Sequence, residues 1–303
     1  MGAELRAVRR RIRAVSSTAK ITRAQELIAS SRIIRAQRRV QDATPYAREL
    51  TRAVEAVVSR SAAVTHPLTT EPENPSRAAM VVITSDRGFA GGYNANVLRE
   101  SQRLSGLLTS RGTEPVPYVS GRKGIAWYRF RGQDVAGQWS GYSDQPTPAD
   151  ANRMAADLLS AFNTPADEGG VDEIHVVYTE FVSMLSQRPV VRRILPLEIE
   201  ETTEEPVSGP IPIYEFEPSP EDVLDALLPW YTESRLYFAL LESAAAEIAS
   251  RRRAMKSATD NANDLIEKLT RQANQARQAE ITQEISEIVG GANALAEATT
   301  GSE

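Results

Sequence analysis

The hydrophobic pattern of the chain changes twice and separates two helical ends from a central segment. Residues 1–44 and 230–303 contain no proline and are rich in alanine, arginine, glutamate and leucine. Proline removes a helix hydrogen bond and clashes with the preceding turn, so its absence permits long continuous helices. In the first stretch Leu5, Val8, Ile12 and Val15 recur at the spacing of one apolar helix face.

We interpret further apolar residues as the continuation of both helices. The first stripe extends through Ile21, Leu27, Ile28, Ile33 and Ile34, and we expect its helix to run past Pro45, with a kink, to Val57. The second follows an irregular coiled-coil spacing, with alanine between its large residues, which predicts a gentle supercoil. Its positions are Leu236, Leu240, Ile248, Met255, Leu265, Leu269, Ile281, Ile285 and Ile288.

The two helices enter and leave the same central segment, so a pair formed by them is antiparallel. The C-terminal helix is longer by roughly 20 residues, which is about 30 Å at the rise of an α-helix. This overhanging end contains Ile281, Ile285, Ile288, Val289 and Leu295. A single helix that exposes such residues to water is unfavourable, so we expect it to insert into a partner.

The central segment alternates short apolar runs with helical patterns. We predict strands at Ala78–Thr84, Val116–Ser120, Ile174–Leu185 and Val190–Glu200, with a hairpin around Ser186, Gln187 and Arg188. We predict helices at Ala95–Leu108, Ile125–Phe130 and 148–163. Strands that alternate with helices favour a small, mainly parallel sheet.

The predicted fold class is therefore α/β, with an antiparallel coiled coil of long N- and C-terminal helices and a small central Rossmann-like α/β domain. The expected boundaries are 1–59 for the first helix, 77–200 for the central domain, 201–222 for an acidic, proline-rich connector and 223–297 for the second helix.

Charge and composition narrow the class of protein. Residues 1–40 carry eleven arginines or lysines against two glutamates, whereas residues 198–225 carry ten acidic residues and no basic one. This polarity indicates electrostatic partners. The chain has no cysteine and no apolar run long enough to span a membrane. The basic N-terminal helix has no aromatic residue before Tyr46, which argues against nucleic-acid binding.

The sequence offers few candidates for chemistry. The glycine-rich run SDRGFAGGYN (Ser85–Asn94) lies between a strand and a helix, where many α/β folds bind phosphate. It matches neither of the phosphate-binding motifs GxGxxG and GxxxxGK(S/T). We therefore interpret it as a tight turn that packs closely on a neighbouring element, with Asp86 or Asn94 as helix caps. His66 and His175 lack ligand spacing. We expect no catalytic residue, no metal and no cofactor.

Four motifs, in order along the chain, resemble the gamma subunit of the F-type ATP synthase. KITRAQELIASSR (Lys20–Arg32) is similar to the family's KITKAMEMVAASK, and SDRGFAGGYN to its SDRGLCGGYN. RAMKSATDNA (Arg253–Ala262) and ITQEISEIVGGANAL (Ile281–Leu295) resemble its two C-terminal motifs. Gln25, Phe89 and Ala90 depart from the family pattern.

The resemblance implies a non-catalytic rotor shaft of a bacterial complex. Its partners would be the ATP synthase α and β subunits, the epsilon subunit and the membrane c-ring, so that the chain lies at the cytoplasmic face of the cell membrane and contacts the membrane only through the complex. The family turn is Ser85, Asp86, Arg87, Gly88, Gly91 and Gly92. The implied contacts to the α/β ring are Arg9, Arg10, Lys20, Arg23, Arg251, Arg252, Ile281, Gln283, Glu284, Ile285, Ile288 and Leu295.

Two other hypotheses remain open. One is a coiled-coil scaffold or adaptor with an α/β head and no rotary role. The other is an α/β enzyme that uses the glycine-rich turn, in which case replacing Gly88, Gly91 or Gly92 would abolish its activity. For the surfaces that meet epsilon or the c-ring, the candidates are Tyr118–Phe130 and Leu195–Phe216.

Overall fold

The computed structural model describes residues 3–60, 72, 74–197, 217 and 219–300, with side chains from residue 4 to residue 293 outside the gaps and residues 59 and 60. The chain divides into two units. One contains residues 1–28 and 253–303, and the other contains residues 29–252. The helices α1 (Ala3–Arg60) and α5 (Pro220–Thr300) contribute to both.

Among the described residues, the second unit contains one five-stranded sheet in the order β3-β2-β1-β4-β5. Its strands are β1 (Arg77–Ile83), β2 (Glu114–Ser120), β3 (Gly137–Trp139), β4 (Glu173–Phe181) and β5 (Gln187–Leu195). All neighbours are parallel except β5, which pairs antiparallel to β4. The prediction of a mainly parallel sheet is confirmed.

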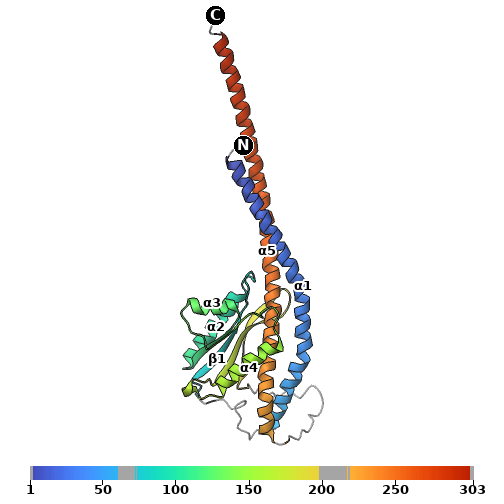
Figure 1. Ribbon diagram of the computed structural model, residues 1–303, viewed down its shortest axis with the longest axis vertical. Helices are drawn as coiled ribbons and strands as arrows, with labels where there is room; N and C mark the ends of the chain where they lie inside the picture. The colour runs from blue at the N-terminus through green and yellow to red at the C-terminus, as the bar shows by residue number, and fades with distance from the viewer. Residues whose placement is uncertain (1–2, 61–71, 73, 198–216, 218, 301–303) are drawn as a thin grey trace. The chain divides into compact units, whose positions relative to one another are not determined.

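Helices cover both faces of this sheet (Figure 1). On one face, α2 (Tyr93–Ser110) and α3 (Arg122–Phe130) pack on Ala78, Met80 and Val82 of β1. On the other face, α4 (Pro148–Phe162) and the parts of α1 and α5 in this unit pack on the alternate β1 residues. Burial on both faces explains why β1 is continuously apolar.

Local signals start the helices at the observed positions. Thr147 and Asp150 form a reciprocal capping box before α4, whose first residue is Pro148. Before α5, the Ser219 hydroxyl accepts a hydrogen bond from the Asp222 N–H at 3.1 Å. The helix therefore begins at Pro220, ahead of the proline-free stretch, and Pro229 lies inside it. Pro45 lies inside α1, and the kink there stays a prediction.

The predicted hairpin is displaced. β4 ends at Phe181 and β5 begins at Gln187, so Gln187 and Arg188 are strand residues and the turn precedes them. Ser183 closes that turn, because its N–H donates to the Ser186 carbonyl at 2.9 Å. The predicted strand extended to Leu185 because apolar residues continue past Phe181, although the pairing with β5 does not. β3 and the short helix η1 (Ala166–Glu168) are three residues each and were not predicted.

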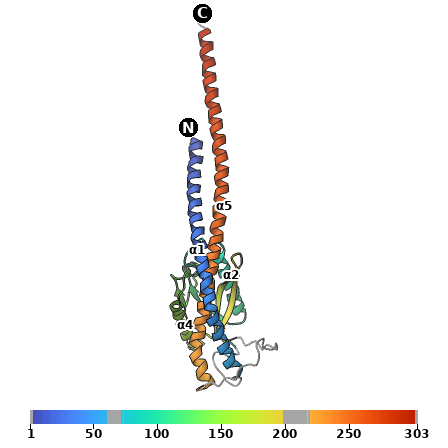
Figure 2. The same cartoon turned by 90° about the vertical axis from the view of Figure 1, so that its right-hand side faces the viewer.

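In the first unit, α1 and α5 lie side by side and antiparallel (Figures 1 and 2). Leu5 of α1 and Met255 and Leu269 of α5 are buried. The spacing that begins at Leu5 and Val8 continues through Ala19, Thr22 and Glu26, all three of which are buried. The seam therefore keeps a strict alternation of three and four residues.

The predicted continuation of the stripe through Ile21, Leu27 and Ile28 is wrong, since these three side chains are exposed. Ile34, in the second unit, is also exposed, whereas its neighbour Ile33 is buried against Ala245, Ile248 and Ala249. The helix register, which is set by spacing, outweighs residue hydrophobicity here. Small residues in the seam allow the helices to approach closely.

The predicted overhang of α5 is confirmed. Every residue from Ile281 to Asn293 is exposed, and α5 extends past the start of α1 in both views (Figures 1 and 2). This part of the helix has no neighbour among the described residues of its unit that covers it.

Candidate functional site

The turn Ser85–Asn94 connects β1 to α2 and is closed by its first and last residues. The Ser85 N–H donates to Asn94 Oδ1 at 2.9 Å, and Asn94 Nδ2 donates to the Ser85 hydroxyl at 2.7 Å. Gly91 has φ 57°, a left-handed conformation that favours glycine, and Phe89 has φ 63°. Asn94 does not cap α2, because it is the second residue of that helix and Gly92 holds the N-cap position.

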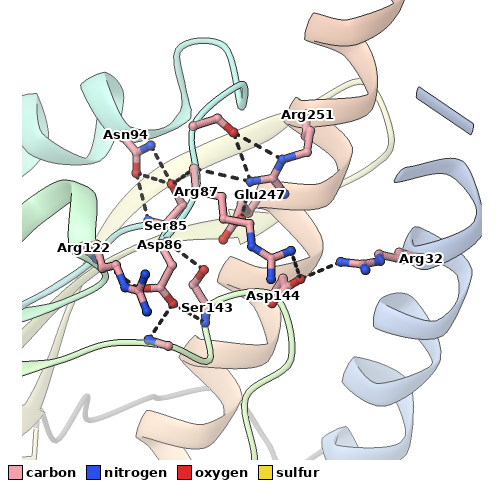
Figure 3. Close-up of polar contacts among 12 residues, drawn as sticks. Arg32, Ser85, Asp86, Arg87, Asn94, Arg122, Ser143, Asp144, Glu247 and Arg251 are labelled. Carbon is pink, nitrogen blue, oxygen red and sulfur yellow. Dashed lines mark hydrogen bonds and ion pairs between the residues drawn. The ribbon is translucent and has the colours of Figure 1, made fainter. Parts of the chain in front are cut away.

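Asp86 fixes the loops around the turn (Figure 3). Its Oδ1 accepts a hydrogen bond from the backbone N–H of Arg122 at 3.1 Å. Its Oδ2 accepts from the backbone N–H groups of Gly141 and Ser143 at 2.8 and 3.0 Å. Since Arg122 is the first residue of α3, Asp86 caps that helix from another segment of the chain.

Asp144 connects the turn to α1 (Figure 3). Its Oδ2 lies 2.7 Å from Arg32 Nη1 on α1 and 3.4 Å from Arg87 Nη1 in the turn. Both contacts are ion pairs to the same carboxylate oxygen. One acidic side chain therefore connects α1 and the turn within this unit.

Arg251 connects the turn to α5. Its Nη2 lies 2.6 Å from Glu247 Oε1 and 3.4 Å from the carbonyl oxygens of Arg87 and Gly88. Glu247 is only 1% exposed, and burial raises the pKa of its carboxyl although the charge of Arg251 partly opposes this. Burial, together with the charge of Glu247, raises the pKa of the adjacent Tyr93. The predicted tight packing of the turn on a neighbouring element is thus confirmed.

The implied ring contacts differ in how exposed their side chains are. Arg9, Arg10 and Lys20 are exposed, and Arg23 pairs with Glu26 at 2.8 Å. Arg252 Nε donates to Ser30 Oγ at 2.9 Å, and Arg251 is largely buried against Glu247 and the turn. Arg251 therefore does not face outward, because its guanidinium is bound to Glu247 and to the turn.

At the end of α5, large apolar side chains share one helix face. Ile281, Ile285 and Ile288 are 44%, 56% and 71% exposed, and Val289 on the same face is 53% exposed. Gln283 bonds to Glu287 at 2.9 Å, and Glu284 is exposed. The side chain of Leu295 lies outside the described residues.

Within the described residues, no three His, Cys, Asp or Glu side chains gather where they could hold a metal ion. In the same residues no helix combines the length and hydropathy needed to cross a membrane. In the second unit, the turn is bound to both α1 and α5. In the first unit, the end of α5 is exposed.

Comparison with known proteins identifies the family. The ATP synthase family model matches residues 4–295. The ATP synthase gamma chain of Acidothermus cellulolyticus is 63% identical over 303 residues, with 100% of both chains covered. That of Frankia casuarinae is 61% identical over 299 residues, with 99% of this chain and 100% of the other covered.

Solved structures show the same fold. A chain in the central stalk and c-ring structure of the Tetrahymena thermophila mitochondrial ATP synthase has a TM-score of 0.59 at 22% identity, covering 78% of this chain and 99% of that one. A chain of the Euglena gracilis mitochondrial enzyme has a TM-score of 0.57 at 17% identity, covering 90% and 95%. The chain belongs to the ATP synthase gamma-chain family and is a non-catalytic subunit that forms the rotor shaft of that complex.

Proposed function

We propose that the exposed end of α5, from Ile281 to Leu295, turns inside an apolar sleeve formed by the α and β subunits. The observation that carries this proposal is the set of large apolar side chains on a helix end that is exposed throughout its described length. Exposed apolar surface of this kind marks an interaction site, because hydrating it is unfavourable. Gln283 and Glu284, on the same helix end, would contact the sleeve through its polar groups.

The proposal extends to the basic side chains near the start of α1. Arg9, Arg10, Lys20 and Arg23 are exposed on the first unit, and we propose that they face acidic surfaces of the β subunits as the shaft turns. Arg252 is half-buried beside Ser30 and is a further candidate. Charged contacts across such an interface steer orientation more than they add affinity.

The mechanism follows from asymmetry rather than from chemistry on this chain. A ligand or a partner shifts a conformational equilibrium only by contacting its two states differently. A shaft with apolar and basic patches on particular faces presents a different surface to each β subunit at each angle. Rotation driven by ion flow would then move each β subunit through its open and closed states, while ATP forms on β.

The head is proposed to connect the shaft to the membrane side of the complex. The candidate surfaces for epsilon and the c-ring are Tyr118–Phe130 and Leu195–Phe216. Of the second range, the residues after Leu197 lie outside the described residues. This arrangement would place the chain at the cytoplasmic face of the cell membrane, held there through its partners.

A single-cysteine crosslink tests the sleeve, because the chain has no cysteine of its own. Ile285→Cys in the purified complex would be labelled with a photoactivatable, cysteine-reactive reagent and the adducts identified by mass. We expect adducts with α or β. Gln102→Cys, on the exposed surface of α2, is the matched control and should give no such adduct.

Two results would count against the proposal. An intact complex in which Ile285→Cys gives no adduct with α or β would refute the sleeve. An adduct with a second copy of this chain would favour the coiled-coil scaffold instead.

A further inference from the structure

We propose that Asp144 is a positioning residue that fixes the angle of the head on α1 and α5. The head is the five-stranded sheet together with α2, α3 and α4. Asp144 acts through Arg32 and Arg87 and works together with the Glu247–Arg251 pair on the other helix. The turn Ser85–Asn94 is then bound to both helices. We call the two sets of contacts its fastenings: Asp144 with Arg32 and Arg87 toward α1, and Arg251 with Glu247 and the turn carbonyls toward α5. The proposal rests on the rotor-shaft role and concerns residues of the second unit alone.

The fastening to α1 is well formed. Asp144 is 16% and Arg32 35% exposed in their side chains, so their 2.7 Å contact is partly shielded from water. A charge-assisted hydrogen bond of this length is among the stronger polar contacts in proteins. The same oxygen also pairs with Arg87, and the preceding residue, Ser143, is held to Asp86 through its N–H and its hydroxyl. The carboxylate is therefore set in place before it meets Arg32.

The fastening to α5 uses different contacts. Glu247, one helical turn before Arg251, orients the guanidinium toward the carbonyl oxygens of Arg87 and Gly88. Beside it, Ala90 and Tyr93 pack on Ala246 in a small apolar cluster. Arg87 therefore takes part in both fastenings, through its side chain toward Asp144 and through its carbonyl toward Arg251 (Figure 3).

The apolar core is the other contact between the two helices and the sheet. Val54 and Val57 of α1 and Leu224 to Leu240 of α5 pack on the sheet through non-directional contacts. These contacts hold the head to the helices, and the polar contacts at the turn add fixed donor and acceptor directions to them. Ion pairs and hydrogen bonds are directional, so two of them on different helices oppose twisting of the head.

Rotational noise tests these fastenings in the working complex. The complex is held by its α/β ring, and a bead is attached to the head at Gln102→Cys. The mean-square angular fluctuation of the bead is measured while the motor waits for ATP. We expect Asp144→Asn to raise that fluctuation about two-fold, with little change in the rate of ATP hydrolysis, because it removes the negative charge that strengthens the contact to Arg32.

Matched variants make the result specific. Asp144→Glu keeps the charge and should recover part of the stiffness. Asp157→Asn, which weakens a hydrogen bond from Trp139 in the same unit, should leave the fluctuation unchanged. Arg32→Gln removes the same ion pair from the α1 side and should reproduce Asp144→Asn, which also covers a failure of the first variant to assemble.

The outcomes separate this proposal from the sleeve. Fluctuations in Asp144→Asn and Arg32→Gln equal to those of Asp157→Asn would overturn the positioning role of Asp144 while leaving the crosslinking result untouched. A bead that never turns, on a complex that hydrolyses ATP with the otherwise unmodified chain, would instead contradict the rotary role.

Discussion

Thr22 of α1 and Thr259 of α5 meet hydroxyl to hydroxyl in the buried seam of the first unit, with 2.8 Å between their oxygens. Each hydroxyl also lies near a carbonyl of its own helix, that of Ala19 or Met255. A polar pair at a seam position costs stability relative to apolar residues but fixes which positions face each other.

The pair predicts a coupling between the two residues. Thr22→Val and Thr259→Val should each lower the free energy of unfolding by about 1 kcal/mol, since each leaves the other hydroxyl buried without this partner. The double variant should cost less than the sum, because no hydroxyl is then left without its partner. Urea unfolding of the purified chain, followed by circular dichroism, measures the cycle. Additive losses would show that the two hydroxyls do not interact.

Glu242 predicts a dependence of stability on pH. Burial raises the pKa of its carboxyl to about 7, with the charge of Glu180 adding to this and Tyr178, Arg192 and Arg235 opposing it. A raised folded-state pKa means that the stability contribution is fully present below the ordinary value and is lost as pH rises through about 7. We expect the chain to lose about 2 kcal/mol of this contribution between pH 5 and about pH 8.

Glu242→Gln cannot ionise and should flatten that profile. Glu168→Gln, which alters an exposed carboxylate of η1, is the control and should keep the wild-type slope. Unfolding midpoints at several pH values would decide the matter. A Glu242→Gln profile that is as steep as the wild-type one would mean that other groups carry the dependence.

At Gly121, next to the turn, the structure leaves no room for a side chain. Its φ is +98°, and a Cβ there would come within 2.2 Å of the Thr84 carbonyl oxygen at the end of β1. Gly121→Ala should therefore destabilise the second unit by roughly 3 kcal/mol, from strain and from the clash. Gly141 has φ +104° but open space around it, so Gly141→Ala should cost only about 1 kcal/mol. Similar thermal midpoints for both variants would contradict the role of the close approach.

Charge at the start of α1 predicts an effect on coupling. Reversing Arg9 and Arg10 to glutamate should lower ion-driven ATP synthesis roughly three-fold or more per assembled complex, because like charges would then face each other. The lysine double variant keeps the charge and should retain synthesis. Both would be measured in membrane vesicles with the amount of complex determined in parallel. If the glutamate and the lysine double variants synthesise ATP at the same rate, Arg9 and Arg10 do not form the proposed contact.

The sequence by itself determined the architecture, because long proline-free helices, a continuously apolar β1 and a glycine-rich turn are local signals. Its motifs indicated the family, and its overhanging isoleucines indicated the exposed end of α5. It also contained the seam register, since the spacing from Leu5 to Val15 continues to Ala19 and Thr22. That register was missed because the larger Ile21 and Leu27 drew the stripe away from it.

The tertiary structure alone decided which polar groups meet. Asp86 caps a helix that begins 36 residues later, and Asp144 joins Arg32, 112 residues before it, to the turn. Such contacts leave no periodic trace in the chain, because they depend on how separate loops pack. For the same reason Arg251, which looks like an outward basic residue in the sequence, is bound to Glu247 and the turn in the folded chain.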